Sequence, residues 1–347
     1  MTNIETTYAG LKLKNPVIVA SSGLTDCVAK NQKMEKAGAG AIVLKSLFEE
    51  QILRETASMT KNYSGMDGCD YLETYVRQHQ LANYIKLIAD TKKVCTIPVI
   101  ASISCYDDAG WTEFAQQIEQ AGADAIEVNM MALQTATDYA YGSFEKRHID
   151  VLTQLKKVVG LPIIMKLGSN LTCPPALIHQ LFAHGAAAVV LFNRLYQPDI
   201  DIDTMTQTSG MVFSQQADLS TTLRWLGITS AQVPQLDMAA SGGIHEPQDV
   251  VKAILAGATA VEICSAIYLQ GESFIDQCTE FLTEWLEEVE RDFSHPSLIG
   301  WCPFNETWDT CHHFPESQSC EQNNDVIRII YEQTKLLDPT RPCVDTS

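Results

Sequence analysis

The sequence predicts an α/β fold, a (β/α)8 TIM barrel, followed by a short C-terminal appendage. The first observation is a repeat, in which a helical segment ends at a Gly-Ala pair and passes at once into a short apolar strand. Glycine at a helix end adopts the left-handed conformation that other residues avoid, and the small residues after it let the backbone turn into a buried strand. The four copies begin at Gly38, Gly122, Gly185 and Gly257.

The second observation is that proline opens the apolar runs between these repeats, a position where its missing N–H donor matters least. These prolines are Pro16, Pro98, Pro162 and, in a weaker pattern, Pro234. Interleaving the two sets predicts eight strands, which span residues 16–22, 41–46, 98–104, 125–130, 162–168, 188–194, 237–243 and 260–266. The runs are continuously apolar, as expected of parallel strands covered on both faces. A doubly wound open sheet is the alternative, but eight regular alternations favour the closed barrel.

Length and cysteine content indicate a boundary near the C-terminus. A chain of 347 residues exceeds the roughly 250 residues of a typical barrel of this kind. Seven of the 11 cysteines are scattered through the barrel, where we expect reduced thiols. The other four are Cys302, Cys311, Cys320 and Cys343. We therefore assign residues 1–285 to the barrel and residues 286–347 to a tail that is not expected to be an independent domain.

The charge of the chain restricts its partners. A formal net charge of −19 argues against nucleic acid and anionic membranes, which are bound through clustered Lys and Arg. The sequence has no run of about 18 apolar residues, and its first residues lack the pattern of a signal peptide. We expect a cytoplasmic protein with no membrane or nucleic-acid partner.

Active sites of such barrels form at the carboxyl ends of the strands. The polar and glycine residues at these ends are Ser21, Ser22, Gly23, Lys45, Ser46, Asn129, Lys166, Asn193, Ser241, Gly242, Gly243, Cys264 and Ser265. The two lysines need a negative partner, because burial penalises a charged ammonium, and either a loop carboxylate or a bound anion would serve. Backbone N–H groups of Gly242, Gly243 and Ser265 follow the seventh and eighth strands, the usual phosphate site of these barrels.

As an ordered set, residues 15–24, Lys45-Ser46, Asn129, Lys166, Asn193 and residues 241–244 resemble the dihydroorotate dehydrogenases, which are FMN enzymes on this barrel. The resemblance covers about residues 4–285. It implies that FMN is held by Ala20, Ser21, Gly23, Lys45, Ser46, Asn129, Lys166, Ser241, Gly242, Gly243 and Ser265, and the substrate by Asn129 and Asn193. Lys45 is implied at the flavin ring as a catalytic residue, where a lysine stabilises the anionic reduced ring.

Two departures from that family fall on the substrate side. The family places a cysteine base after the asparagine of the fourth strand, whereas this chain has Ala132, which cannot accept a proton. Residues 56–65 replace the asparagine-rich loop expected after the second strand. The sequence therefore predicts a retained flavin and a changed substrate. Cys105 is the candidate replacement base, although neighbouring carboxylates disfavour its thiolate, and Tyr106, Glu127 and Tyr141 are weaker alternatives.

The tail resembles a short region of family 2 glycoside hydrolases, with Asn305 and Glu306 at the positions of the substrate contact and the acid/base. Retaining glycosidases need a second carboxylate roughly 5 Å away, which a later strand supplies in that family. No such strand follows, so no glycosidase activity is expected. The tail cysteines and its two histidines, His312 and His313, lack the paired C-x2–4-C spacing of zinc sites, and no metal is predicted.

Taken together, the sequence predicts an FMN-dependent oxidoreductase that acts on a carbon–carbon bond of an unidentified small molecule, with an unidentified electron acceptor. Two other hypotheses remain: an inactive flavin- or phosphate-binding barrel and, less favoured, a glycosidase formed by the tail. The sequence leaves open whether the chain forms a homodimer.

Overall fold

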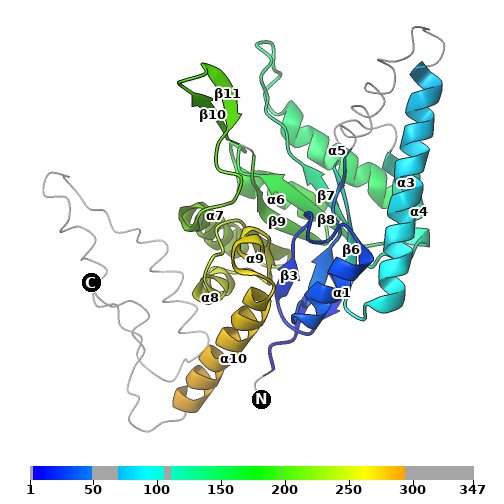
Figure 1. Ribbon diagram of the computed structural model, residues 1–347. Coiled ribbons are helices and arrows are strands. Elements are labelled where there is room, and N and C mark those ends of the chain that lie inside the picture. The colour runs from blue at the N-terminus through cyan, green and yellow to red at the C-terminus, as the bar shows by residue number, and fades with distance from the viewer. Residues whose placement is uncertain (1–2, 49–68, 105–110, 196, 294–347) are drawn as a thin grey trace, which may run out of the picture.

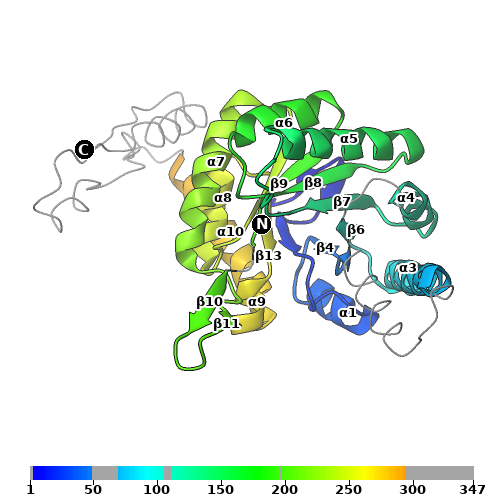
Figure 2. The same cartoon turned by 90° about the horizontal axis from the view of Figure 1, so that it is seen from above.

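The computed structural model describes residues 3–48, 69–104, 111–195 and 197–293. Eight parallel strands form its central barrel, ringed by helices (Figures 1 and 2). In barrel order they are β4 (Ala41–Val43), β3 (Val17–Val19), β13 (Ala260–Ile263), β12 (Asp237–Ser241), β9 (Ala188–Asn193), β8 (Ile163–Gly168), β7 (Ala125–Met130) and β6 (Val99–Ser104). Because β4 also pairs with β6, the sheet closes on itself, which confirms the predicted barrel and excludes an open sheet.

The strands lie where the Gly-Ala repeats and prolines predict them, with ends up to three residues shorter than expected. The four repeat glycines all have positive φ angles, between 88° and 102°, so they make the left-handed turns that the repeat requires. The helices are α1 (Val28–Lys36), α3 (Cys69–Val94), α4 (Trp111–Gln120), α5 (Ser143–Val158), α6 (Pro174–Ala183), α7 (Leu219–Gln232), α8 (Pro247–Leu255), α9 (Ser265–Gln270) and α10 (Ser273–Phe293).

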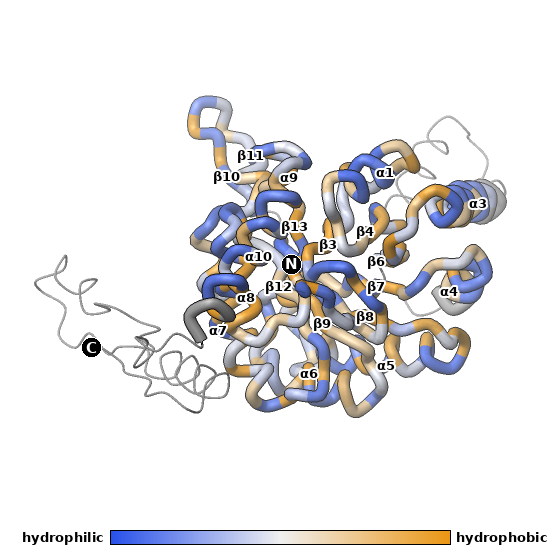
Figure 3. The backbone as a smooth tube through the Cα atoms, turned by 90° about the horizontal axis from the view of Figure 1, so that it is seen from below, coloured by the Kyte–Doolittle hydropathy of each residue, from blue (hydrophilic) through white to orange (hydrophobic). Residues whose placement is uncertain are grey.

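Two apolar layers hold the barrel together. One lies between strands and helices, and the other fills the barrel interior with residues such as Ile18, Ile100 and Ile164. Figure 3 shows the apolar strands at the centre of the ring. A short hairpin of β1 (Thr6–Tyr8) and β2 (Leu11–Leu13) adds Tyr8 and Leu13 to the interior layer and closes the lower end of the barrel. The sequence analysis did not predict this hairpin, because three-residue strands carry too little pattern.

Two further elements near the mouth of the barrel were also not predicted. The two-residue strand β5 (Leu47–Phe48) pairs beside β6. A second hairpin, β10 (Pro198–Asp201) with β11 (Thr206–Ser209), follows β9 and projects above the mouth, as Figure 1 shows. Its residues are almost all exposed, so the buried apolar run that announces a barrel strand is missing.

Several other expectations concern the periphery of the fold. Cys27, Cys95, Cys173, Cys264 and Cys278 are free thiols, as predicted. No helix in the described ranges is long and apolar enough to cross a membrane. The predicted boundary at residue 285 falls within α10, which continues to Phe293. The tail residues Asn305 and Glu306 lie outside the described residues, so the division into barrel and tail stays a prediction.

Candidate active site

A cavity of about 150 Å³ opens at the carboxyl ends of the strands. Eight of the residues that the resemblance assigns to FMN or substrate line it: Ala20, Ser21, Lys166, Asn193, Ser241, Gly242, Gly243 and Ser265. They come from opposite ends of the described chain and meet because parallel strands of a closed barrel end at one mouth.

A larger cavity of about 420 Å³ adjoins the first. The two share the wall residues Phe192, Asn193, Arg194, Ser241 and Gly242. Small-molecule sites in proteins typically have volumes of roughly 300–1,000 Å³. The first cavity alone is therefore small for a cofactor, whereas the two together offer room for a cofactor and a substrate.

Ser46 and Asn129, two of the residues predicted from the sequence, do not line the cavity but form hydrogen bonds to residues that do. The Oγ atoms of Ser46 and Ser21 lie 2.9 Å apart, and the backbone N–H of Ser46 donates to Ser21 Oγ at 2.8 Å. Asn193 Nδ2 donates to Asn129 Oδ1 at 2.7 Å, and the N–H of Arg194 donates to Asn193 Oδ1 at 2.8 Å. The Asn193 amide is thus fixed on both sides, with its remaining N–H and lone pair free to meet a ligand.

The structure does not bring Gly23 and Lys45 to the cavity. A Cβ on Gly23 would lie 2.7 Å from the hydroxyl of Tyr268, so this glycine permits a close approach of α9. Lys45 is half-buried at the end of β4 and lies outside the walls of both cavities. Residues 49–68, which follow it, are outside the described residues.

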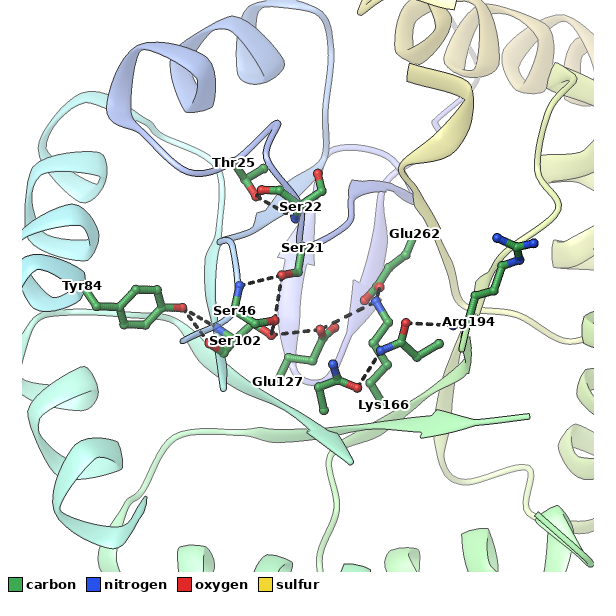
Figure 4. Close-up of polar contacts among 12 residues, drawn as sticks. Ser21, Ser22, Thr25, Ser46, Tyr84, Ser102, Glu127, Lys166, Arg194 and Glu262 are labelled. Atoms are coloured by element: carbon green, nitrogen blue, oxygen red, sulfur yellow. Dashed lines mark hydrogen bonds and ion pairs between the residues drawn. The ribbon is translucent and has the colours of Figure 1, made fainter. Parts of the chain in front are cut away.

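Lys166, Glu262 and Glu127 form a charge triad (Figure 4), of which Lys166 and Glu262 line the cavity. Lys166 Nζ lies 2.5 Å from Glu262 Oε2 and 3.7 Å from Glu127 Oε1. All three residues are at most 5% exposed. Each lies two residues beyond an apolar side chain of the barrel interior, so the alternation along each strand directs it inward.

These contacts answer the question that the sequence left open about Lys166. Its negative partners are carboxylates, but they belong to strands β7 and β13 rather than to neighbouring loops. Burial lowers the pKa of Lys166, yet the two carboxylates outweigh burial and leave the pKa above its ordinary value. Burial and the charge of Glu262 raise the pKa of Glu127 well above its usual range. Glu127 therefore belongs to the triad, and it does not line the cavity where a base would meet substrate.

A chain of hydroxyl groups connects the triad with the cavity wall (Figure 4). Ser102 Oγ donates to Glu127 Oε1 at 3.3 Å and lies 2.7 Å from Ser46 Oγ, which in turn contacts Ser21. Tyr84 of α3 fixes the backbone of Ser102, because its hydroxyl donates to the carbonyl at 3.0 Å and accepts from the N–H at 2.7 Å. The triad, these three serines and Tyr84 thus form one connected network.

The opposite end of the cavity is built from glycines and hydroxyls. Gly242 and Gly243 have φ angles of +92° and +82°, and a Cβ on Gly243 would lie 2.2 Å from the backbone nitrogen of Leu219. Ser214, which also lines the cavity, donates its N–H to Ser265 Oγ at 3.0 Å. Its own Oγ lies 3.0 Å from Nε2 of His245. This end offers backbone N–H and hydroxyl donors, the donor set that suits a phosphate.

Sequence reasoning missed Glu262, Ser214 and His245. A signal for Glu262 was present, because Glu127 and Glu262 occupy the same position in two copies of the Gly-Ala repeat, the fifth residue after the glycine. Ser214 gave no such signal, because it lies in an irregular segment between the β10–β11 hairpin and α7.

The residues considered as possible bases lie in different surroundings. Tyr141 is 99% exposed and lines neither cavity, so the structure gives this weaker alternative no support. Cys105 and Tyr106 fall outside the described residues. Ala132 is half-buried, and its carbonyl accepts a hydrogen bond from Asn170 Nδ2 at 3.0 Å. Cys264 lines the cavity, but burial raises its pKa, which favours the neutral thiol.

Within the residues that the structure describes, no group of His, Cys, Asp and Glu is arranged to hold a metal ion. The cysteines and histidines of the tail lie outside this range.

Comparison with known proteins adds a family to this geometry. The sequence model described as Dihydroorotate dehydrogenase matches residues 3–286. The catalytic subunit of dihydroorotate dehydrogenase B (NAD(+)) of Thermoplasma volcanium is 25% identical over 311 residues, which cover 86% of this chain and 98% of that protein. Dihydroorotate dehydrogenase A (fumarate) of Lactobacillus helveticus is 27% identical over 327 residues, covering 88% of this chain and 100% of that protein. The NAD-dependent dihydropyrimidine dehydrogenase subunit PreA of Escherichia coli is 23% identical over 86% of this chain and 76% of that protein. The family model covers the predicted barrel almost from end to end, and the resemblance of the tail to glycoside hydrolases stays a prediction.

Proposed function

This chain belongs to the dihydroorotate dehydrogenase family and is an oxidoreductase acting on CH–CH groups, and from that premise we propose that it uses FMN to oxidise or reduce a small molecule other than dihydroorotate. The proposal rests on the convergence of eight strand-end residues on one cavity with a donor-rich end and a charged end.

FMN suits these two ends. Backbone N–H groups of Gly242 and Gly243, together with Ser265, would hold its phosphate, because a Cβ at Gly242 would meet nothing closer than 3.9 Å and the backbone there is open to a ligand. Lys166 and Ser21 would meet the ring system at the other end. When bound, FMN supplies the hydride-transfer chemistry, and the protein supplies binding, orientation and charge.

The substrate would be positioned by Asn193. Its amide is fixed by Asn129 and by the N–H of Arg194, so its remaining donor and acceptor point in defined directions without further ordering. A planar group with a carbonyl and an N–H or hydroxyl would satisfy both. The carbon–carbon bond that is oxidised or reduced would lie next to that carbonyl.

Ala132 argues against dihydroorotate as the substrate. The side chain at this position has no proton acceptor, so it cannot deprotonate a C–H group of the substrate. A substrate that is already acidic, or an electron-poor double bond that accepts a hydride, has no such requirement. The changed substrate loop at residues 56–65 lies outside the described residues and agrees with this proposal only at the level of sequence.

The first test is the visible absorption spectrum of the purified protein. We expect the bands of oxidised flavin, bleached by dithionite and lost together with released FMN on denaturation. Dihydroorotate should then fail to reduce the bound flavin, whereas some α,β-unsaturated carbonyl compound should reoxidise the reduced protein. A colourless protein that cannot be reconstituted with FMN would refute the cofactor, and rapid turnover of dihydroorotate would refute the changed substrate.

The second candidate is a flavin- or phosphate-binding barrel without turnover, which the missing base at Ala132 favours. It predicts that bound flavin is reduced by dithionite but is reoxidised by no organic acceptor. NAD+ and fumarate, which the names of two relatives include, should be tested among these acceptors. A chromogenic glycoside tests the glycosidase hypothesis, for which we expect no hydrolysis. The electron acceptor, a homodimer and a cytoplasmic location stay predictions.

A further inference from the structure

The charge triad at the cavity holds more negative than positive groups. The ammonium of Lys166 faces two carboxylates, those of Glu262 at 2.5 Å and Glu127 at 3.7 Å. If all three were ionised, the set would carry one net negative charge. An uncompensated charge among residues that are at most 5% exposed is strongly unfavourable.

One proton removes this imbalance, and the geometry indicates where it resides. Glu127 Oε2 and Glu262 Oε1 accept no hydrogen bond from any described residue. A proton on Glu127 supplies a donor in this unsatisfied space, and the raised pKa of Glu127, caused by burial and by Glu262, is consistent with that. Glu262 makes the shorter contact and remains the ionised partner of Lys166. The triad is then a neutral set, formed by one ion pair and one carboxylic acid.

The members of the triad are not equally placed toward the cavity. Lys166 and Glu262 both line it, whereas Glu127 lies behind them. Cys264 is another wall residue, and Tyr8 lies below the triad. Burial raises the pKa of both, so neither adds a charge. A cofactor ring in the cavity would therefore meet a lysine whose charge a carboxylate balances.

We propose, building on the function proposed above, that Glu262 is a positioning residue that holds Lys166 and reduces the positive charge it presents to the cofactor, and so lowers the reduction potential of a bound flavin. A reduced flavin ring carries negative charge, which a free lysine beside it would stabilise. The carboxylate of Glu262 opposes that stabilisation because it lies on the same wall. The reduced cofactor is then a stronger electron donor, which suits reduction of an electron-poor double bond conjugated to a carbonyl.

The experiment is a measurement of the reduction potential of FMN-loaded protein against a reference dye at one fixed pH. The variants are Glu262→Gln and, as a matched control, Glu127→Gln. Glu262→Gln removes the charge that balances Lys166, and it should shift the flavin equilibrium toward the reduced form about tenfold or more, which is ~30 mV for a two-electron couple. Glu127→Gln replaces a neutral acid by an amide of the same shape, and it should change that equilibrium less than twofold.

A purely structural ion pair would give a different result. In that case both variants would lose stability, but the reduction potential of the bound flavin would not change. In the double variant Glu127→Gln/Glu262→Gln, residue 127 cannot ionise in place of residue 262, because neither position carries a carboxyl group. The reduction potential of this variant should be at least as high as that of Glu262→Gln. If Glu262→Gln does not retain FMN, Glu262→Asp, which keeps the charge but shortens the side chain, should raise the potential by a smaller amount.

An unshifted potential in Glu262→Gln and in the double variant, or an equal shift in Glu127→Gln, would overturn the inference while leaving FMN binding intact. A wild-type protein that binds no FMN would overturn the proposed function and this inference together.

Discussion

Substitution of Lys166 by Met should destabilise the protein far more than loss of an ordinary lysine. Methionine fills a similar volume, but it leaves Glu127 and Glu262 buried without a cation. Removing one partner of a buried ion pair typically costs about 3–5 kcal/mol, because the remaining charge is uncompensated. At ~1.5 °C per kcal/mol for a chain of this size, the expected drop in Tm is roughly 4–8 °C.

Lys92→Met provides the matched control. Lys92 lies 2.6 Å from Asp124, but both side chains are about 30% exposed. Solvent screens such a pair, so its loss should cost at most about 1 kcal/mol. Thermal unfolding of the wild type and the two variants, followed by far-UV circular dichroism in one buffer, measures the difference.

The pH dependence separates charge from packing. A carboxyl group whose pKa is raised in the folded state contributes stability when it is protonated. For Glu127 that contribution is complete below its ordinary pKa of 4.5 and is lost as pH rises through the folded value. Lys166 lowers the pKa of Glu127, so without it this pKa should rise further. The deficit of Lys166→Met should then be largest near about pH 8 and should shrink toward about pH 5. A deficit equal to that of Lys92→Met, or one that does not change with pH, would refute the charge triad.

Two further substitutions test the network and the glycine-rich end of the cavity. Tyr84→Phe removes both hydrogen bonds to the backbone of Ser102 and leaves a buried N–H and carbonyl unsatisfied, so urea unfolding should show a loss of about 1–3 kcal/mol with an unchanged m-value. A change below the error of the titration would contradict the role of this tyrosine. Gly243→Ala should lower stability by more than Gly10→Ala, because both have φ near +80° but only at Gly243 would the new Cβ overlap Leu219. Gly10→Ala should lose only the ~1–2 kcal/mol of a left-handed residue and keep its FMN, and equal losses in the two variants would show that the overlap is relieved at no cost.

Local sequence features predicted the barrel because they act over a few residues. Each Gly-Ala pair ends a helix and starts a strand by its own conformational preference, and the proline-led runs are apolar enough to be buried. The elements that escaped, the three-residue β1 and β2 and the exposed β10 and β11, lack such local features. The same limit applies to the candidate base Tyr141. A loop residue has no periodicity that indicates where its side chain points, and this side chain is exposed to solvent.

The sequence by itself determined which residues stand at the mouth of the barrel, because parallel strands that close into a barrel must end together. It could therefore nominate Ala20, Lys166 and Asn193 as neighbours without a structure. Only the tertiary structure decided what Lys166 binds. Glu262 lies 96 residues away on a strand that is not adjacent to β8, and the two meet because closure and register bring their positions into the same region of the interior. The charge that the site presents to a cofactor depends on this contact between Lys166 and Glu262, and no local pattern in the sequence specifies the contact.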